Sequence, residues 1–271
     1  MLHRQTKDTV RATLGSLLQK KQPLLILLAV LLPAGTIAEE IIGGHEAQPH
    51  SHPYMALVEL TLNGTEEQCG GFLVEEDIVL TAAHCWGSPM SVILGAHDIV
   101  LQENTQQEIP VKKAIRHPDH NNVPQSNDIM ILQLNTKAKL TAAVGLLPLP
   151  GESDHVRPGQ VCSVAGWGWI SENNQTSKLH EVDLTVQEDI QCESRYLNYN
   201  RTIQLCVGDP QKKMCTFKGD SGGPLVCKNV AQGIISYGNT IGTPPRVSTK
   251  ISSFLPWIKK TIKGLQLEES P

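Results

Sequence analysis

A heptapeptide near the C-terminal end, KGDSGGP at residues 218–224, constrains the fold of this chain more than any other stretch. Its three glycines permit positive φ and a close approach of a second backbone or a ligand on either side of Ser221. The backbone N–H groups of Gly219 and Ser221 can also point at one spot, where they would stabilise a developing oxyanion. Taken alone, the stretch could instead be a glycine-rich turn that contains a serine by chance.

Two further stretches favour a nucleophilic enzyme. TAAHC at residues 81–85 contains His84, and SNDIM at residues 126–130 contains Asp128. A serine hydroxyl needs a general base that removes its proton, and that base needs an acid that orients it. The order His84, Asp128, Ser221 is one of the chain orders in which such triads occur. We therefore predict that these three side chains are catalytic.

Together these stretches resemble the trypsin-like serine proteases of the chymotrypsin fold. The likeness extends over residues 41–271 and is greatest to the granzyme and mast-cell protease group, within which granzyme B and its near relatives are the most similar branch. As in that branch, no cysteine stands directly before Lys218, and the string Pro244-Pro245-Arg246 follows later. The stretches that carry the likeness are IIGGHEA (41–47), VAGWG (164–168), CVGDP (206–210), FKGDS (217–221) and FLPWIKK (254–260).

The pattern after residue 41 is that of a β protein. Short apolar runs typical of strands occur without a long helical period before the end, which favours an all-β barrel or sandwich. The clearest runs are residues 55–60, 71–74, 78–80 and 129–132. The resemblance makes this two six-stranded antiparallel β-barrels, at about 50–145 and about 160–250. Residues 252–264 predict a C-terminal helix that serines cap, with Pro256 in its first turn and one apolar face. That face consists of Phe254, Trp257, Ile258 and Ile262.

The first 38 residues have the pattern of a secretory signal peptide with an extended basic n-region. Five Lys and Arg precede an apolar run at residues 24–32, and small residues before the bond after Ala38 suit signal peptidase. A rarely used upstream start would explain the long n-region better than a signal anchor would. No later stretch is apolar enough to span a bilayer. We therefore expect a mature form without a membrane span, in a cytolytic or secretory granule or outside the cell.

The two residues before Ile41 are both glutamates, Glu39 and Glu40. The resemblance implies that they are an activation dipeptide, which a dipeptidyl peptidase removes. The freed ammonium group of Ile41 would then pair with Asp220, next to the nucleophile. An edge strand that begins at Ile41 is the alternative interpretation, but it does not explain the two preceding acids.

Charge argues against several classes of partner. The chain has 23 Lys and Arg, of which five precede residue 41, and 27 Asp and Glu, of which three do. Residues 41–271 therefore contain 18 basic and 24 acidic residues, which gives a formal charge of −6. This balance predicts weak binding to sulfated proteoglycans, and the lack of a basic stripe with interleaved aromatics argues against nucleic-acid binding. The clustered histidines lack a recognised ligand spacing, so we expect neither a metal nor another cofactor. These histidines are His45, His50, His52, His117 and His120.

Seven cysteines in a chain with secretory features argue for disulfides, and the odd number leaves at least one thiol without a partner in the chain. Spacing alone leaves many pairings open. The pairs that the resemblance implies are Cys69–Cys85, Cys162–Cys227 and Cys192–Cys206, with Cys215 left over. Three sequons predict glycans on surface loops. They begin at Asn63, Asn174 and Asn200.

The resemblance implies a serine endopeptidase of cytolytic granules that acts on protein and peptide substrates, takes part in apoptosis and is inhibited by a serpin. It assigns the nucleophile of an acyl-enzyme mechanism to Ser221 and the general base, later the acid, to His84. Asp128 would fix the imidazole tautomer, and the N–H groups of Gly219 and Ser221 would form the oxyanion hole.

The same match places Arg246 in the primary specificity pocket, with Cys215 at its floor. Because a guanidinium keeps its proton and a carboxylate accepts two parallel N–H bonds from it, we expect cleavage after aspartate. Lys218 would favour a second acid two residues upstream in the substrate. The strand that would pair with the substrate backbone is Ser236-Tyr237-Gly238.

Alternatives to this specificity and to the activity stay open at the level of sequence. If Arg246 pairs with an internal acid or with a Cys215 thiolate, the pocket is apolar and the enzyme is chymase-like, with cleavage after Phe, Tyr, Leu or Met. An inactive homologue would act as a binding or antimicrobial protein instead. Cys215 is either a buried, inert thiol or a thiolate whose pKa Arg246 lowers.

Overall fold

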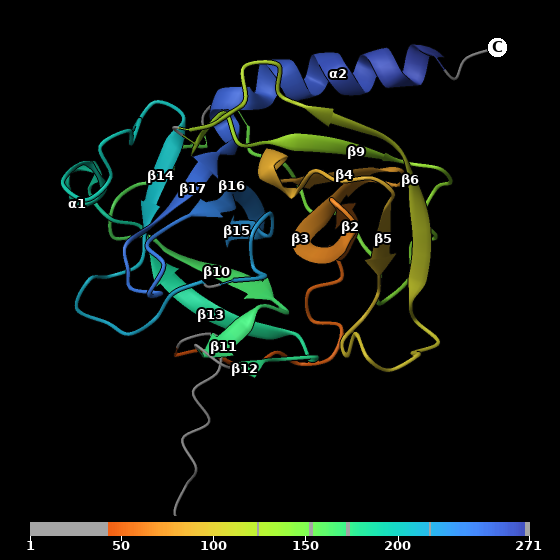
Figure 1. Ribbon diagram of the computed structural model, residues 1–271, viewed down its shortest axis with the longest axis horizontal. Coiled ribbons are helices and arrows are strands. Elements are labelled where there is room, and N and C mark those ends of the chain that lie inside the picture. Colours follow the sequence, from red (N-terminus) through yellow and green to blue (C-terminus); the bar gives the residue numbers. More distant parts are fainter. Residues whose placement is uncertain (1–42, 124, 152–153, 172–173, 217, 269–271) are drawn as a thin grey trace, which may run out of the picture. The chain divides into compact units, whose positions relative to one another are not determined.

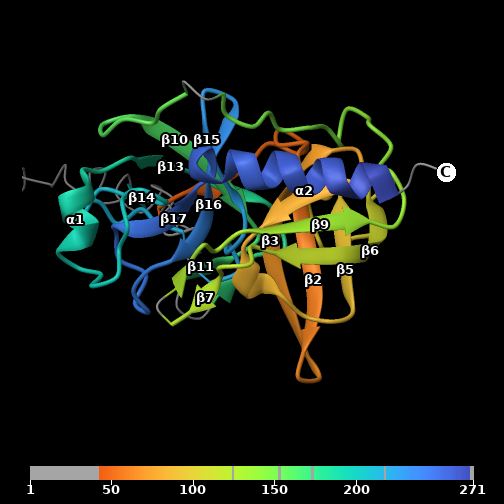
Figure 2. The same cartoon turned by 90° about the horizontal axis from the view of Figure 1, so that it is seen from above.

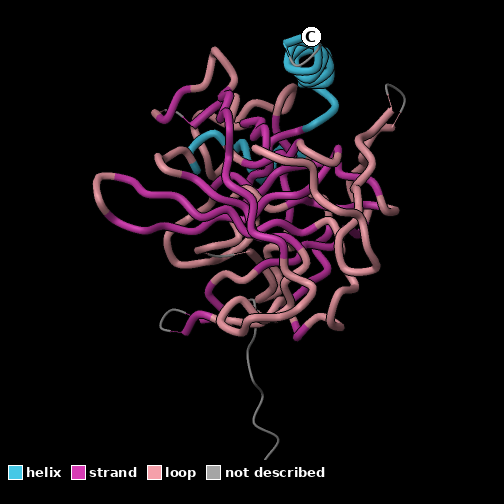
Figure 3. Tube along the Cα trace, turned by 90° about the vertical axis from the view of Figure 1, so that its right-hand side faces the viewer, coloured by secondary structure: helices cyan, strands magenta, loops and turns pink. Residues whose placement is uncertain are grey.

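The structure is a computed structural model, and it describes residues 43–123, 125–151, 154–171, 174–216 and 218–268 of the 271-residue chain. The predicted leader, the glutamate dipeptide and Ile41 therefore lie outside the described residues. Strands and loops make up most of the described chain, and the long helix stands at one side of it (Figure 3). No helix in the described part is long and apolar enough to cross a membrane.

The first half of the described chain forms a closed six-stranded antiparallel barrel, shown at the right of Figure 1. Around the barrel, each strand pairs with the next in the order β2-β3-β4-β9-β6-β5. Their bounds are β2 (Met55–Leu62), β3 (Thr65–Glu75), β4 (Ile78–Thr81), β5 (Met90–Leu94), β6 (Gln107–Arg116) and β9 (Met130–Leu134). Asn63 (φ 52°) and Gly64 (φ 82°) make the turn between β2 and β3, because both residue types accept the positive φ that a tight hairpin needs. Figure 2 shows this hairpin projecting beyond the other strands.

The second half, together with β1 from the start of the described chain, forms a seven-stranded sheet in the order β1-β13-β10-β15-β16-β17-β14. Its strands are β1 (His45–Glu46), β10 (Val161–Gly166), β13 (His180–Thr185), β14 (Gln204–Val207), β15 (Pro224–Cys227), β16 (Val230–Tyr237) and β17 (Arg246–Lys250). A bridge between Val186 and Val207, with a hydrogen bond from Gly208 N–H to Thr185 O (2.9 Å), joins the end of β14 to the end of β13. The six strands from β13 to β14 thus close on themselves, and β1 is added outside this ring.

Two small hairpins lie outside the barrels: β7 (Asn121–Asn122) with β8 (Gln125–Ser126), and β11 (Trp169–Ser171) with β12 (Asn174–Gln175). The first precedes Asp128, and the second follows the glycine-rich end of β10. Both come from stretches without an apolar alternation, so the sequence did not predict them as strands.

The C-terminal helix differs in its bounds from the prediction over 252–264. The chain first makes a 3-10 turn, η2 (Ile251–Phe254), and α2 then runs over Leu255–Glu268. The serines lie in the 3-10 turn and do not cap α2, while Pro256 does lie in its first turn. Trp257 of the predicted apolar face is only partly buried. The buried face consists of Leu255, Ile258, Ile262 and Leu265.

This buried face of α2 packs against the first barrel. Its four apolar side chains belong to the same core cluster as the inward-facing residues of β2, β3, β4 and β9. Figures 1 and 2 both show α2 lying along β9. A second, short helix, α1 (Asp189–Glu193), precedes β14, and its five residues are too few to give a periodicity that the sequence reveals.

The structure contains three disulfides, which are the pairs that the resemblance implied. Each links a strand to a nearby element: Cys69–Cys85, Cys162–Cys227 and Cys192–Cys206. The first closes a loop of 16 residues, for which the chain-entropy estimate is a stabilisation of about 3 kcal/mol. Cys215 is a free, buried thiol.

Candidate active site

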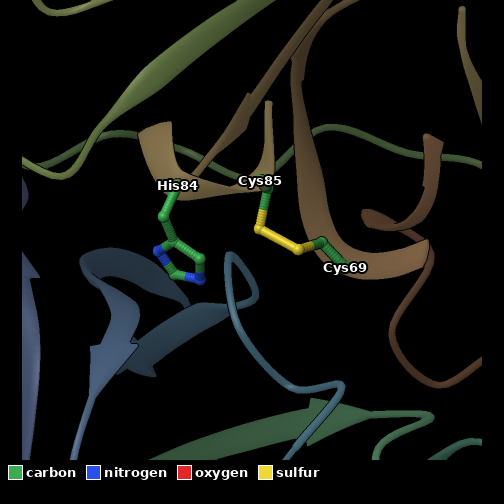
Figure 4. Close-up of side chains that lie close together, drawn as sticks. All are labelled: Cys69, His84 and Cys85. Carbon is green, nitrogen blue, oxygen red and sulfur yellow. A yellow bond between two sulfur atoms is a disulfide. The ribbon is translucent and has the colours of Figure 1, made fainter. Parts of the chain in front are cut away.

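His84 lies on the 3-10 turn η1 (Ala83–Cys85), directly after β4 of the first barrel. The next residue, Cys85, is joined to Cys69 of β3, so the disulfide fixes the turn to the barrel wall. Figure 4 shows the imidazole of His84 beside this disulfide. The side chains of His84 and Cys85 leave the same turn, and Cys69 lies opposite. The His84 side chain is 27% exposed, so one edge of the ring remains open to a substrate.

Asp128 lies between β8 and β9 and is almost completely buried, with a side-chain exposure of 1%. Its Oδ2 accepts a hydrogen bond from His84 Nδ1 (2.8 Å), and its Oδ1 accepts one from the backbone N–H of His84 (3.0 Å). The hydroxyl of Ser236, at the end of β16, also donates to Oδ2 (2.6 Å). Burial alone would raise the pKa of the Asp128 carboxyl, but these donors, the charge of His84 and an amide from Gln125 hold that pKa well below its usual range. Asp128 is therefore a carboxylate at any pH near neutral.

Ser221 lies in the loop before β15 of the second sheet, and its carbonyl oxygen lies 3.8 Å from Sγ of Cys85, the residue after His84. The carbonyl oxygen of Ser221 accepts a hydrogen bond from the N–H of Gly70 on β3 (2.7 Å), which fastens this loop to the first barrel. In the described part of the chain, no hydrogen bond joins the Ser221 hydroxyl to His84. A serine hydroxyl turns about a single bond, and such catalytic hydrogen bonds often form only when a substrate is bound.

The two N–H groups expected to form an oxyanion hole, those of Gly219 and Ser221, donate to no residue in the described part of the chain. Gly219 adopts φ +90°, a conformation that side-chain-bearing residues rarely adopt. Both donors are thus available to a ligand, as stabilisation of an oxyanion requires.

Asp220 is fully buried beneath the Ser221 loop, and its Oδ1 accepts a hydrogen bond from Gly168 N–H (3.1 Å). A Cβ atom at Gly168 would lie 2.4 Å from this oxygen, so only glycine permits the contact. The predicted partner of Asp220, Ile41, lies outside the described residues.

Arg246 begins β17, and its guanidinium lies against the backbone of Gly238. A Cβ atom at Gly238 would lie 2.6 Å from Arg246 Cζ, so a larger residue at this position would displace the guanidinium. Nη1 donates to the carbonyl oxygen of Asn239 (3.2 Å), whereas the buried Nε has no hydrogen-bond partner among the described residues. No carboxylate in the described part of the chain forms an ion pair with Arg246.

Cys215 lies close to Arg246 and is fully buried. Its Sγ–H donates to the carbonyl oxygen of Gly242 (2.7 Å). Burial raises the pKa of the thiol to about 11, and the nearby Arg246 charge only partly opposes this. The hypothesis of a reactive thiolate at Cys215 is therefore wrong in its sign, and the thiol is neutral near pH 7.

The predicted substrate strand Ser236-Tyr237-Gly238 ends β16, next to this region. Its side chains have inward partners: Ser236 contacts Asp128, and the ring of Tyr237 packs edge-on against Tyr196 at 5.5 Å. The role of this strand in substrate binding remains a prediction.

Lys218 precedes the predicted oxyanion hole, and its ammonium lies 5.4 Å from the centre of the Trp169 ring. Both side chains line a cleft of about 1010 Å³ that starts at Gly219 and Ser221 and continues over the β2–β3 hairpin. Glu59, Glu66 and Glu67 line its far end. Lys218 thus lines the same cleft as Gly219 and Ser221.

Gln125 is a polar side chain that reaches both members of the His84–Asp128 pair and that the sequence did not predict. It lies on β8, three residues before Asp128, and its Nε2 donates to Asp128 Oδ2 (2.7 Å). Proximity in the sequence is the only signal that could have indicated it.

The histidines do not gather around a common point. His45 and His52 each approach Glu181, at 3.3 and 2.6 Å, and His117 packs against the rings of Phe254 and Trp257. The group with the spacing of metal ligands is His84 with Cys69 and Cys85, within 4.8 Å of one another. The two sulfur atoms form a disulfide and offer no thiolate to a metal (Figure 4).

Two of the three sequon asparagines are described with their side chains, and both are exposed. Asn63 lies at the tip of the β2–β3 hairpin, and Asn200 lies in the loop before β14. The side chain of Asn174 lies outside the described part. Glycans at Asn63 and Asn200 remain predictions.

Comparisons with known proteins agree with the fold and identify the family. A family model described as Trypsin matches residues 41–258. Granzyme H of Homo sapiens is 60% identical over 245 residues, which cover 90% of this chain and 100% of that protein. Granzyme B of Homo sapiens is 59% identical over 244 residues, which cover 89% of this chain and 99% of that protein. A solved structure described as "Structure of GrC" matches with a TM-score of 0.79 and 54% identity, over 82% of this chain and 99% of its own.

Proposed function

Because this chain belongs to the trypsin family of serine proteases and is a serine endopeptidase, we propose that it cleaves peptide bonds on the carboxyl side of aspartate. Its substrates would be proteins and peptides, and its place of action a cytolytic granule or the extracellular space. A role in apoptosis follows from the same resemblance to granzymes.

The proposed mechanism uses the three side chains at the seam between the two halves. Ser221 attacks the scissile carbonyl, and His84 Nε2 takes the hydroxyl proton and later gives it to the leaving amine. Asp128 holds the other ring nitrogen through the 2.8 Å hydrogen bond and stabilises the imidazolium that forms. The available N–H groups of Gly219 and Ser221 would bind the oxyanion of the tetrahedral intermediate.

The observation that carries the aspartate specificity is the incomplete set of partners around Arg246. This half-buried guanidinium donates to the carbonyl of Asn239, and the residues that the structure describes supply no partner for its buried Nε. A buried donor that is left unpaired costs about 1–3 kcal/mol, and more for a charged group. A substrate carboxylate would satisfy it, with two parallel N–H bonds that a neutral side chain cannot accept.

Two explanations that would leave the pocket apolar have little support. The thiol of Cys215 is neutral and donates its proton to Gly242, so it does not balance the charge of Arg246. In the described residues, no internal carboxylate does so either.

The test compares kcat/KM for matched peptides that end in Asp, Glu, Phe or Met before the scissile bond. Truncating one partner of a buried charge pair costs about 2–5 kcal/mol, so Arg246→Gly should lose at least about 30-fold in kcat/KM for Asp and turn toward Phe. Cys215→Ser, a change at a neighbouring buried residue that keeps Arg246, is the matched control and should keep the Asp preference. A wild-type preference for Phe or Met would replace the proposal by the chymase-like function.

Labelling with a fluorophosphonate probe distinguishes an active protease, whether Asp-specific or chymase-like, from an inactive binding protein. Only an assembled site activates Ser221, so the activated protein should label and His84→Ala should not. Failure of the wild-type protein to label would overturn the catalytic assignment itself.

A further inference from the structure

Gln125 occupies a place in the active site that the proposed mechanism does not use. It begins the two-residue strand β8 and is half-buried. Its amide nitrogen Nε2 lies 2.7 Å from Asp128 Oδ2, 3.0 Å from His84 Nδ1 and 3.3 Å from Ser236 Oγ. One amide group thus reaches both members of the pair that activates the nucleophile.

The hydrogen-bond network fixes which end of the amide faces Asp128. The Asp128 carboxylate and the Ser236 hydroxyl oxygen are both acceptors for an N–H group. If the amide were reversed, its oxygen would take the place of Nε2, 2.7 Å from a carboxylate oxygen, and two acceptors would repel each other. The NH₂ end therefore faces the pair.

This places three donors on a single carboxylate oxygen. Asp128 Oδ2 accepts from His84 Nδ1 (2.8 Å), Ser236 Oγ (2.6 Å) and Gln125 Nε2 (2.7 Å), whereas Oδ1 accepts one backbone N–H. A carboxylate oxygen has about two lone pairs in its plane, so Gln125 and His84 share the same electron density. Gln125 also contributes to keeping the pKa of Asp128 low, which shows that it makes this carboxylate a weaker base.

The amide also lies next to the atom that carries charge during catalysis. When His84 takes the proton of Ser221, the ring becomes an imidazolium with a proton on Nδ1. Gln125 Nε2 lies 3.0 Å from His84 Nδ1. The positive ends of its N–H dipoles then point toward a positively charged ring, which they repel. Nδ1 already carries a proton in the neutral ring, so two donors face each other in both states, but the repulsion grows when the ring gains its positive charge. The contact therefore favours the neutral ring.

We propose that Gln125 is a positioning residue that restrains the reaction, because its amide competes with His84 for Asp128 and opposes the imidazolium form of His84. This rests on the proposed roles of His84 and Asp128. Withdrawing the amide should therefore make the pair a stronger base. The groups around the His84 ring that bear on its titration are Asp128 before β9, Ser236 on β16, Ser221 before β15, the disulfide between η1 and β3, and Gln125 itself.

The test measures pH profiles of kcat/KM for wild type, Gln125→Leu and Gln125→Asn with one Asp-containing peptide. Both variants withdraw the amide, the first by removing it and the second by shortening the side chain by one methylene. Both should move the acidic limb to higher pH and raise kcat/KM about three- to tenfold on the plateau above that limb, with the larger part of the change in kcat. Gln187→Leu, whose amide donates to Thr185 O far from the pair, is the control and should match wild type.

A second readout follows His84 directly. The NMR resonance of the Nδ1 proton reports its hydrogen bond with Asp128, and this resonance should move downfield in both Gln125 variants. The proposal is overturned if kcat/KM falls at all pH values without a shift of the limb, if only the Leu variant changes, or if the resonance stays in place. These outcomes can be told apart from a failure of the proposed roles of His84 and Asp128. In that case the fluorophosphonate probe would still label Ser221 in the His84→Ala variant.

Discussion

At the scale of single residues, Cys215 gives the clearest pH-dependent prediction. Its thiol has a pKa of about 11 in the folded protein because it is buried, whereas an ordinary cysteine titrates near 9.0. Since the folded-state pKa is the higher one, burial of the neutral thiol stabilises the fold below pH 9, and this contribution is lost as the pH rises toward 11. Between pH 9 and pH 11, the free energy of unfolding should fall by about 2–3 kcal/mol more for wild type than for Cys215→Ser. Unfolding experiments at both pH values measure this difference.

Iodoacetamide gives an independent check on the same thiol. At pH 7.5 the native enzyme should remain unlabelled and fully active, whereas one equivalent should react in denaturant, because the other six cysteines stay in disulfides. Rapid labelling of the native protein at pH 7.5, with loss of activity, would restore the thiolate hypothesis.

The sequence predicted individual residues unequally well. The sequence indicated His84, Asp128 and Ser221, because the stretches around them contain the residue types of a catalytic triad. In the structure, His84 Nδ1 lies 2.8 Å from Asp128 Oδ2. Gln125 could not be predicted, because its contact arises from the hairpin β7–β8 turning back on the pair and not from a spacing. Ser236 was expected to serve a substrate strand, and only the fold reveals that its hydroxyl donates to Asp128.

At the scale of elements, the loop before β15 should depend on the start of the chain. Asp220 is fully buried in this loop and accepts the N–H of Gly168, and a buried carboxylate is stabilised by a cation. We predict that the Ile41 ammonium supplies that cation once Glu39-Glu40 is removed. Because breaking a buried pair costs about 3–5 kcal/mol, protein that keeps the dipeptide should cleave peptides at least about 100-fold more slowly.

Chemical acetylation of the Ile41 amino group is the matched control for this activation, since it removes the charge and leaves the length unchanged. It should reduce kcat/KM as strongly as the retained dipeptide does. Equal rates for protein starting at Glu39 and at Ile41 would contradict the activation scheme.

Elements were predictable where apolar periodicity decides them. Four strands of the first barrel, β2, β3, β4 and β9, follow from apolar runs such as residues 78–80, which lie in β4. The runs named from the sequence did not include β5 or β6. The helix bounds did not follow, because the chain makes a 3-10 turn over η2 before α2 begins at Leu255. The closure of the second ring rests on one bridge between Val186 and Val207, and such a long-range pairing has no local signal.

At the scale of the whole molecule, charge predicts weak binding to sulfated polymers. Residues 41–271 have a formal charge of −6, and three exposed lysines on α2, Lys259, Lys260 and Lys263, form a cationic patch on that helix. Overall repulsion should dominate, so the protein should elute from heparin below physiological salt. The triple Lys→Ser variant should elute only slightly earlier. Retention of wild type well above that salt, lost in the variant, would show that the patch dominates.

The proposed specificity requires that the Arg246 guanidinium reads a substrate charge, and an isosteric pair of peptides tests this requirement. The measurement is kcat/KM of the activated wild-type enzyme for two peptides that differ only in Asp or Asn before the scissile bond. The side chains have the same shape, but only the carboxylate accepts two N–H bonds from Arg246 and balances its charge. We predict that Asp exceeds Asn by at least about 30-fold, the lower end for a buried charge pair. Equal rates for Asp and Asn would contradict the role of Arg246 in recognition.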